Sequence, residues 1–307
     1  MTDRRKVAII SVLAVFLIIP GLSGRTAQEQ KPEQKPEEKQ EQKQKKVPKK
    51  PRAIRVLFIG GSFIYYNNLP DILAKLAQAG GAGTVETGMV ALSGWGLKDH
   101  WQKGDAHRVM RDSDWNFIVL EDESLPGKDA NPEGGPGGGL VEAFRTYARN
   151  FAQSVQDVGA VPVFYLTWAP KGAPEQQAAL NSAYFGVAKE VGAKVAPAGI
   201  AWAEVRERHP EIELYAADGA HPTPAGSYLA ACSIYAAVFG RNPEGLPSKI
   251  GGRPVNPETG KVESDNPQVL MDLPPAQARV LQQAAWAAKK LLDKNRGYLD
   301  VTRAPAR

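Results

Sequence analysis

Residues 56–66 read VLFIGGSFIYY, an apolar run that is interrupted by two glycines and a serine before it continues into aromatic residues. Four consecutive large apolar residues are typical of a strand that is buried on both faces, as in a parallel sheet covered by helices. Gly60 and Gly61 end that strand, and Ser62 follows them directly. Ligands of such sheets bind beyond the carboxyl ends of the strands, so Ser62 is a candidate functional hydroxyl as well as a turn residue.

The chain downstream of this stretch alternates apolar, strand-like runs with longer runs of helical periodicity. We expect strands at 54–60, 84–92, 116–121, 160–168 and 193–199. We expect helices at 69–80, 139–159, 175–192, 200–210, 224–240 and 274–295. This alternation predicts an α/β domain over residues 54–307, with a parallel sheet covered by helices on both faces. Residues 240–273 are rich in glycine and proline and are predicted to be an irregular surface excursion before the C-terminal helix.

The first 27 residues have the layout of a secretory signal peptide. Arg4, Arg5 and Lys6 precede an apolar stretch at 7–19, which is shorter than the about 20 residues of a membrane span. No clear small-residue cleavage site follows, so an uncleaved signal anchor is the alternative. Either interpretation predicts export to the periplasm or the cell exterior.

Residues 28–53 consist almost entirely of Gln, Lys, Glu and Pro and predict a disordered linker, because they offer little to bury. The first 55 residues hold 14 basic and 6 acidic residues, which leaves 24 basic and 27 acidic residues in the remainder. The folded part is thus mildly acidic, which argues against nucleic acid as a partner. The basic segment allows proximity to a membrane or cell wall.

Several chemically versatile side chains have ordinary structural interpretations. The single cysteine, Cys232, excludes an internal disulfide and lies in an apolar helical run, so a buried thiol is expected. His100 is predicted to lie in the core or a pocket wall, His107 in a polar stretch, and His209 at a solvated helix end.

His221 has more informative surroundings. It follows Asp218 by three residues and precedes a predicted helix that Thr223 can cap and Pro224 can begin. In such a loop the carboxylate can hold one imidazole nitrogen while the other faces a serine hydroxyl, as a catalytic base requires. The alternative is that Asp218 caps a turn and His221 packs against it.

Two stretches together resemble a known family. IGGSFIYYNNLP (59–70) and DGAHPTPAGSYLAACSIYAAVFG (218–240) resemble the SGNH (GDSL-type) hydrolase superfamily, in particular a bacterial branch with G-N-S-x-T-Y and D-G-x-H-P-S-x-A-G motifs. The resemblance spans about residues 55–243 and includes SGWGLKDHW, WNFIVLEDES and FYLTW in order. Ile64 occupies the position of the last glycine of the G-x-S-x-G elbow, which argues against the α/β-hydrolase fold.

The resemblance implies a flavodoxin-like three-layer α/β/α fold with a parallel sheet of about five strands. It also implies a serine esterase in which Ser62 is the nucleophile, His221 the general base and Asp218 its orienter. The backbone N–H groups of Ser62 and Gly94 are the candidate oxyanion donors. Most of the superfamily supplies a third donor from the asparagine of a G-x-N-D block, which this sequence lacks.

The sequence departs from the similar branch after the third predicted strand. That branch has Leu-Gln-Glu-Gln-Ser where residues 120–124 read LEDES, so Glu121 replaces a glutamine, and Gly61 replaces the usual Asp or Asn before the nucleophile. We assign Glu121 and Glu123 to the pocket without a fixed role. An ionised Glu121 only accepts hydrogen bonds and would repel an oxyanion. Glu121 is therefore protonated, or its side chain points away from the oxyanion, or activity is altered or lost. The alternative is that residues 121–123 form a solvated acidic loop without a role in the site.

No cofactor or metal is expected. The acidic run at 121–123 has no histidine nearby, and the glycine-rich stretch at 131–144 lacks the Lys-Ser/Thr of a phosphate loop and is interpreted as a flexible loop. The sequence thus predicts an exported esterase acting on carboxylic esters, including O-acetyl groups of carbohydrates. The alternatives are a catalytically impaired glycan-binding module and an acyltransferase that uses the same serine.

Overall fold

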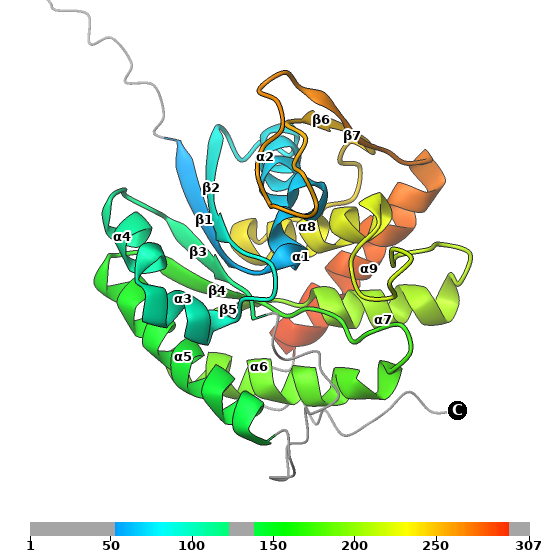
Figure 1. The fold of residues 1–307 in the computed structure, drawn as a ribbon. Helices are drawn as coiled ribbons and strands as arrows, with labels where there is room; N and C mark the ends of the chain where they lie inside the picture. Colours follow the sequence, from blue (N-terminus) through cyan, green and yellow to red (C-terminus); the bar gives the residue numbers. More distant parts are fainter. Residues whose placement is uncertain (1–52, 123–137, 295–307) are drawn as a thin grey trace, which may run out of the picture. The chain divides into compact units, whose positions relative to one another are not determined.

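Five parallel strands form the centre of the molecule in a computed structural model that describes residues 53–122 and 138–294 (Figure 1). The strands are β1 (Ile54–Gly60), β2 (Val85–Ala91), β3 (Phe117–Leu120), β4 (Val161–Tyr165) and β5 (Lys194–Ala196). They lie in the order β2-β1-β3-β4-β5, and every neighbouring pair is parallel. This flavodoxin-like order confirms the predicted fold class. The predicted signal segment (1–27) and all but the last residue of the predicted linker (28–53) lie outside the described residues.

Helices connect the strands and follow the sheet. They are α1 (Ser62–Tyr65), η1 (Tyr66–Asn68), α2 (Leu69–Ala79), α3 (Leu97–Lys103), α4 (Asp105–Arg111), α5 (Gly138–Asp157), η2 (Pro174–Gln176), α6 (Gln177–Val191), α7 (Ala198–Arg208), α8 (Pro224–Phe239) and α9 (Pro275–Lys294). The long helices agree with the sequence expectation. Helices α1, α3 and α4 were not expected, because four to seven residues are too few to display a helical period.

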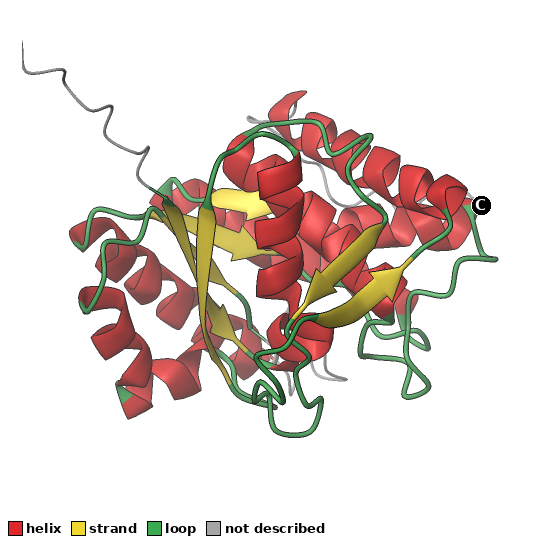
Figure 2. Cartoon of the chain, turned by 90° about the horizontal axis from the view of Figure 1, so that it is seen from above, coloured by secondary structure: helices red, strands yellow, loops and turns green. Residues whose placement is uncertain are grey.

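The sheet separates two apolar cores, which gives the three layers visible in Figures 1 and 2. Alternate residues of a strand point to opposite faces. Val56 and Phe58 of β1 accordingly pack with α2, α7, α8 and α9, whereas Leu57 and Ile59 pack with α3, α4, α5 and α6. Burial on both faces explains why the strands that decide the fold are apolar throughout.

The segment expected to be irregular contains a small antiparallel sheet of β6 (Lys249–Gly252) and β7 (Gln268–Asp272). Short, glycine-containing strands give no alternating pattern, which is why the sequence did not reveal them. The hairpin is fixed to the start of α2: Arg253 forms a salt bridge with Asp71, and its carbonyl accepts a hydrogen bond from Asn68 Nδ2 at 2.7 Å. The excursion therefore lies beside the chain that follows Ser62 (Figure 1).

Helix α8 begins as expected. Pro224 is its first residue, and the Thr223 hydroxyl accepts a hydrogen bond from Gly226 N at 3.2 Å. Cys232 lies fully buried in this helix, where burial raises the pKa of its thiol, so the expected buried thiol is confirmed. Among the described helices, none is both long and apolar enough to cross a bilayer.

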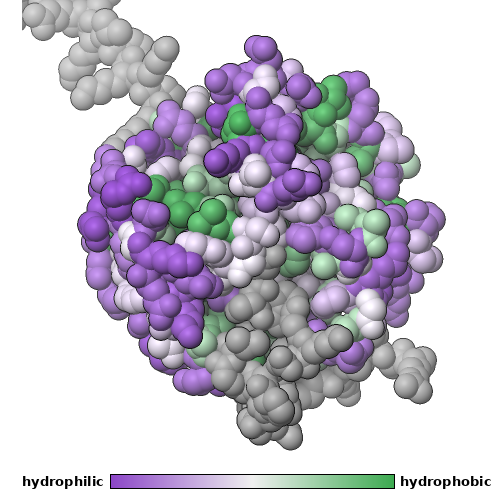
Figure 3. Space-filling view, viewed as in Figure 1, coloured by the Kyte–Doolittle hydropathy of each residue, from purple (hydrophilic) through white to green (hydrophobic). Residues whose placement is uncertain are grey.

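The face shown in Figure 3 is covered mainly by hydrophilic residues, and its hydrophobic residues lie in separate patches. Exposed large apolar side chains of the described residues are correspondingly scattered, with Leu92 after β2 and Val269 in β7 as examples. Scattered apolar residues are normal on a soluble surface.

Candidate active site

Ser62 lies where the sequence placed it, at the carboxyl end of a central strand. Strand β1 ends at Gly60, and Ser62 is the first residue of α1 and fully buried. The turn is tight because a Cβ on Gly60 would lie 2.5 Å from Glu121 Oε2 and 2.8 Å from the Glu121 carbonyl oxygen. Only glycine allows this approach, which explains the glycine that ends the apolar run.

Asp218 and His221 lie in a tight loop between α7 and α8. The loop is closed by hydrogen bonds from Ala216 N to the His221 carbonyl (2.7 Å) and from Gly219 N to the Ala216 carbonyl (3.0 Å). Gly219 has a φ of 72°, in the left-handed region that favours glycine. Asp218 Oδ1 accepts the backbone N–H groups of Ala220 and His221, each at 2.9 Å. The loop thus presents its carboxylate and imidazole in fixed positions.

The structure brings the three distant side chains together. Ser62 Oγ lies 2.8 Å from His221 Nε2, and His221 Nδ1 lies 2.5 Å from Asp218 Oδ2. An ionised carboxylate can only accept, so Nδ1 carries the proton and Nε2 of the neutral ring is an acceptor. The Ser62 hydroxyl therefore donates its proton to Nε2, the direction of transfer that a serine nucleophile requires.

The carboxylate of this arrangement is kept ionised. Partial burial pulls the pKa of Asp218 upward, but hydrogen bonds from the Ala220 N–H and from the ring and backbone N–H of His221 outweigh it, so the pKa lies below its usual value. The Asp218 side chain is 47% exposed and that of His221 is 22% exposed. Solvent can thus reach this side of the site.

The comparisons with known proteins identify the fold at this point. No protein-family model matches the chain, and no curated protein matches it. Among solved structures, a candidate SGNH hydrolase from Slackia heliotrinireducens is 27% identical, with a TM-score of 0.50 over 61% of this chain and 100% of its own. The chain has the SGNH hydrolase fold.

Two further structures extend the comparison. A DUF4886 family protein from Bacteroides uniformis is 18% identical, with a TM-score of 0.57 over 82% of this chain and 98% of its own. An acetyl xylan esterase, AlAXEase, is 15% identical, with a TM-score of 0.49 over 60% of this chain and 100% of its own. The DUF4886 family protein thus covers a larger share of this chain than the candidate SGNH hydrolase does.

Aromatic residues next to Ser62 contact the imidazole of His221. The Tyr66 ring stacks on His221 with centroids 4.1 Å apart and an interplanar angle of 15°. Phe63 meets the same imidazole edge-on at 5.6 Å. Asn67, in a left-handed conformation with a φ of 54°, donates to the Pro222 carbonyl at 3.2 Å. The sequence alone indicates no role for these residues, although Phe63, Tyr66 and Asn67 closely follow the serine.

The candidate oxyanion donors lie on two different loops. The Ser62 N–H is at the start of α1, and Gly94 lies in the exposed turn between β2 and α3, with a φ of 73°. That turn is closed by a hydrogen bond from Trp95 N to the Leu92 carbonyl at 3.1 Å. Nothing is within 4 Å of a Cβ built on Gly94, so its glycine serves conformation rather than close packing.

Glu121 lies beneath the serine turn rather than in a solvated loop. Its side chain is fully buried, and Oε2 accepts the Gly61 N–H at 2.6 Å. Asp122 is also buried, at 2% exposure, so the alternative of a solvated acidic loop does not hold for these two residues. Glu123 and the glycine-rich segment before residue 138 lie outside the described residues.

The other three histidines lie apart from the contacts that join Ser62, His221 and Asp218. His100 is buried, which confirms a core position, and His107 stacks on Phe151 at 5.2 Å. His209 is partly exposed, and its Nδ1 lies 3.3 Å from Glu211 Oε1. Within residues 53–122 and 138–294, no group of three His, Cys, Asp or Glu side chains could hold a metal ion.

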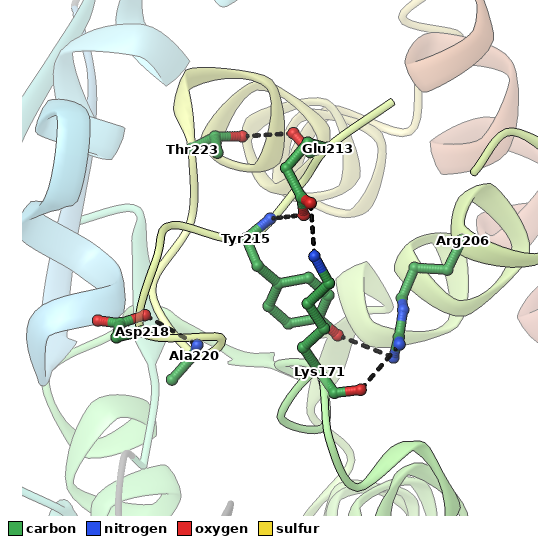
Figure 4. A network of polar contacts seen from close by, with 7 residues as sticks. All are labelled: Lys171, Arg206, Glu213, Tyr215, Asp218, Ala220 and Thr223. Carbon is green, nitrogen blue, oxygen red and sulfur yellow. Dashed lines mark hydrogen bonds and ion pairs between the residues drawn. The ribbon is translucent and has the colours of Figure 1, made fainter. Parts of the chain in front are cut away.

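A polar network supports the loop of Asp218 and His221 from the solvent side (Figure 4). Glu213 pairs with Lys171 Nζ at 2.5 Å and accepts the Tyr215 N–H at 3.0 Å. Arg206 donates to the Tyr215 hydroxyl and to the Lys171 carbonyl. Lys171 N also donates to the Gly219 carbonyl at 2.8 Å, which ties the chain after β4 to the loop itself.

Proposed function

We propose that the protein is a serine esterase in which Ser62 is the nucleophile, His221 the general base and acid, and Asp218 the residue that orients the imidazole. The observation that carries this proposal is the continuous contact from Ser62 Oγ through both ring nitrogens of His221 to Asp218 Oδ2. The match to a candidate SGNH hydrolase at 27% identity supports it. The same contacts also argue against a merely structural Asp–His pair, which needs no serine.

The reaction follows from the direction of the hydrogen bonds. Ser62 Oγ bonds to the ester carbonyl carbon while its proton passes to His221 Nε2. The C–O bond of the ester then breaks, and the leaving alkoxide takes that proton. Water attacks the acyl-serine and gives a proton to Nε2, which returns it to Ser62 Oγ as the carboxylic acid leaves. Asp218 remains ionised throughout.

Two features of the site would lower the energy of the charged states. The Tyr66 face lies against the imidazole, so its negative quadrupole stabilises the imidazolium that forms in each half-reaction. The N–H groups of Ser62 and Gly94 are the proposed donors to the negative oxygen of the tetrahedral intermediate. Such donors are each worth about 3 kcal/mol of activation free energy.

We propose a small carboxylic ester as substrate, with the O-acetyl group of a carbohydrate as the specific candidate. The N-terminal segment supports an exported protein that is cleaved or remains anchored near the membrane or cell wall. The mildly acidic folded part gives no support for nucleic-acid binding. The proposed chemistry requires no cofactor.

Hydrolysis of p-nitrophenyl acetate, butyrate and octanoate by the wild type and by Ser62→Ala tests the proposal. We expect the wild type to prefer the shorter esters and Ser62→Ala to lose about 10³-fold or more in kcat. Release of acetate from acetylated sugars would then test the carbohydrate assignment. Equal rates for wild type and Ser62→Ala would refute a serine esterase.

A further inference from the structure

The end of β3 carries two consecutive buried carboxylates. Residues that follow each other in an extended chain point to opposite faces of the sheet. Glu121 reaches the turn that carries Ser62, where Oε2 accepts the Gly61 N–H at 2.6 Å. Asp122 reaches the opposite side, where Oδ2 accepts the Leu97 N–H at 2.9 Å. Leu97 begins α3, three residues after Gly94.

His100 connects the same two segments. Its ring is 1% exposed, and Nε2 lies 2.9 Å from the Gly60 carbonyl. A carbonyl only accepts, so Nε2 carries the proton and donates. Burial lowers the pKa of His100 through desolvation, which keeps the ring neutral at physiological pH. The Trp95 ring, next to Gly94, lies 5.0 Å from the His100 ring.

The hydrogen bonds of Glu121, Asp122 and His100 form a closed circuit together with the backbone. One hydrogen bond joins Glu121 to Gly61, and a second joins His100 to Gly60, the residue before Gly61. The third joins Asp122 to Leu97, which lies in the same helix, α3, as His100. Because Glu121 and Asp122 are neighbours in the chain, these contacts form a closed circuit. We call these six residues, Gly60, Gly61, Leu97, His100, Glu121 and Asp122, the strand-end brace. The peptide after Gly61 contains the Ser62 N–H, and the turn before Leu97 contains Gly94.

We propose that the strand-end brace positions the two oxyanion donors relative to each other, with Glu121 holding the Ser62 side and Asp122 the Gly94 side. This inference rests on the proposed function, because it concerns the oxyanion of that reaction. It assigns a role to the carboxylate that replaces the family's glutamine. Glu121 fixes the serine turn through its oxygen and need not face the substrate.

The brace works through hydrogen-bond acceptors. When a buried backbone N–H loses its acceptor, the free energy of desolvating that group is no longer compensated. The turn would therefore shift until the N–H finds another partner. A small misplacement of catalytic groups can lower a rate by about 100-fold. An amide oxygen can replace a carboxylate oxygen as acceptor, whereas a thioether of similar size is only a weak acceptor and an alkyl group accepts no hydrogen bond.

The experiment compares Glu121→Met and Asp122→Leu with Glu121→Gln and Asp122→Asn. The readouts are kcat and KM for p-nitrophenyl acetate, and the inhibition constant of phenylboronic acid, which forms a tetrahedral adduct on a nucleophilic serine. We expect the first pair to lose about 10- to 100-fold in kcat, with a parallel loss of boronate affinity and KM changed less than about three-fold. We expect the second pair to remain within about five-fold of the wild type.

Gln282→Leu is the matched control for a buried polar residue elsewhere. Gln282 lies on α9, is 3% exposed and bonds to Gly245 N and the Tyr228 hydroxyl. We expect it to lower the melting temperature without lowering kcat. If Glu121→Met or Asp122→Leu folds and keeps wild-type kcat and boronate affinity, or if Gln282→Leu loses as much kcat, the positioning role is overturned.

Two further measurements keep the inference separable from folding and from the proposed function. If the apolar variants do not fold, a folded Glu121→Gln that loses about 10-fold or more in kcat overturns the role of the oxygen as acceptor. If the wild type and Ser62→Ala are equally inactive, the proposed function fails. Amide exchange at Gly61 and Leu97 then decides whether the brace holds the two loops: faster exchange in Glu121→Met and Asp122→Leu supports it, and unchanged exchange overturns it.

Discussion

The two sides of the candidate site differ in how they are built. The proton-accepting side, formed by Asp218 and His221, lies within four residues of one loop and is partly exposed to solvent. The strand-end brace draws its residues from three distant segments and is buried, with Glu121 at 0% and Asp122 at 2% exposure. The acid–base pair is thus assembled locally, whereas the turn of the nucleophile is held by long-range contacts.

This difference assigns separate tasks to the two sides. A partly exposed imidazole can exchange protons with water and contact a substrate, while buried hydrogen bonds resist the movement of the backbone that carries the donors. Substitutions on the exposed side should alter proton transfer, and substitutions in the brace should alter the geometry of the oxyanion site. The following predictions test that division, from the largest expected effect to the smallest.

Asp218→Asn should have the largest effect of these. The amide would no longer require a proton on His221 Nδ1, so the ring could adopt the tautomer with its proton on Nε2, which cannot accept from Ser62. We expect kcat to fall about 10³- to 10⁴-fold with little change in KM, measured with p-nitrophenyl acetate.

Glu211→Gln is the matched control for Asp218→Asn, because Glu211 also lies beside a histidine, with Oε1 3.3 Å from His209 Nδ1. We expect its kcat to equal that of the wild type. A similar loss in both variants would show that Asp218 has no special part in the reaction.

Tyr66→Leu removes the aromatic face that stacks on His221. We expect the loss of this partly desolvated cation–π contact to lower kcat about 10-fold. Tyr66→Phe keeps the ring and should remain within about two-fold of the wild type. If Tyr66→Phe loses as much activity as Tyr66→Leu, the hydroxyl and not the stacked face is what matters.

His100 makes the stability of the brace depend on pH. Its pKa lies below the ordinary 6.5 in the folded protein because burial disfavours the charged ring. Below that ordinary value the unfolded chain therefore binds a proton that the folded chain does not, and the free energy of unfolding falls as the pH decreases. His107, whose pKa is also lowered by burial, acts in the same direction.

His100→Gln isolates the contribution of His100, since the Gln Nε2–H can still donate to the Gly60 carbonyl while His107 remains in both proteins. We expect the melting temperature of the wild type to fall more than that of the variant between about pH 7.5 and pH 5.5. Equal falls would contradict a buried, neutral His100.

Lys171→Met should have the smallest effect. Lys171 and Glu213 are about half exposed, and an exposed ion pair contributes at most about 1 kcal/mol to stability (Figure 4). The backbone bond from Lys171 N to Gly219 remains in the variant. We expect kcat to change less than about two-fold. A 10-fold loss would show that this network, and not only the loop itself, positions His221.

The same contrast explains what the sequence could reveal. The spacing of Asp218 and His221 and the cap at Thr223 are local patterns, so the loop and its helix could be predicted. Glu121 was recognised as a departure, but its acceptor role depends on Gly61, sixty residues away, and no local pattern encodes that contact. No local pattern indicates the role of Tyr66 either, because its partner, His221, lies far along the sequence.

The most direct test of the central claim is covalent labelling of the folded protein by a fluorophosphonate, followed by mass spectrometry of the labelled peptide. A hydroxyl activated by His221 should give one adduct, on Ser62, and Asp218→Asn should slow its formation. Folded wild-type protein that forms no adduct, or forms it on another residue, would contradict a nucleophilic Ser62; glycan binding without labelling would instead indicate a binding module.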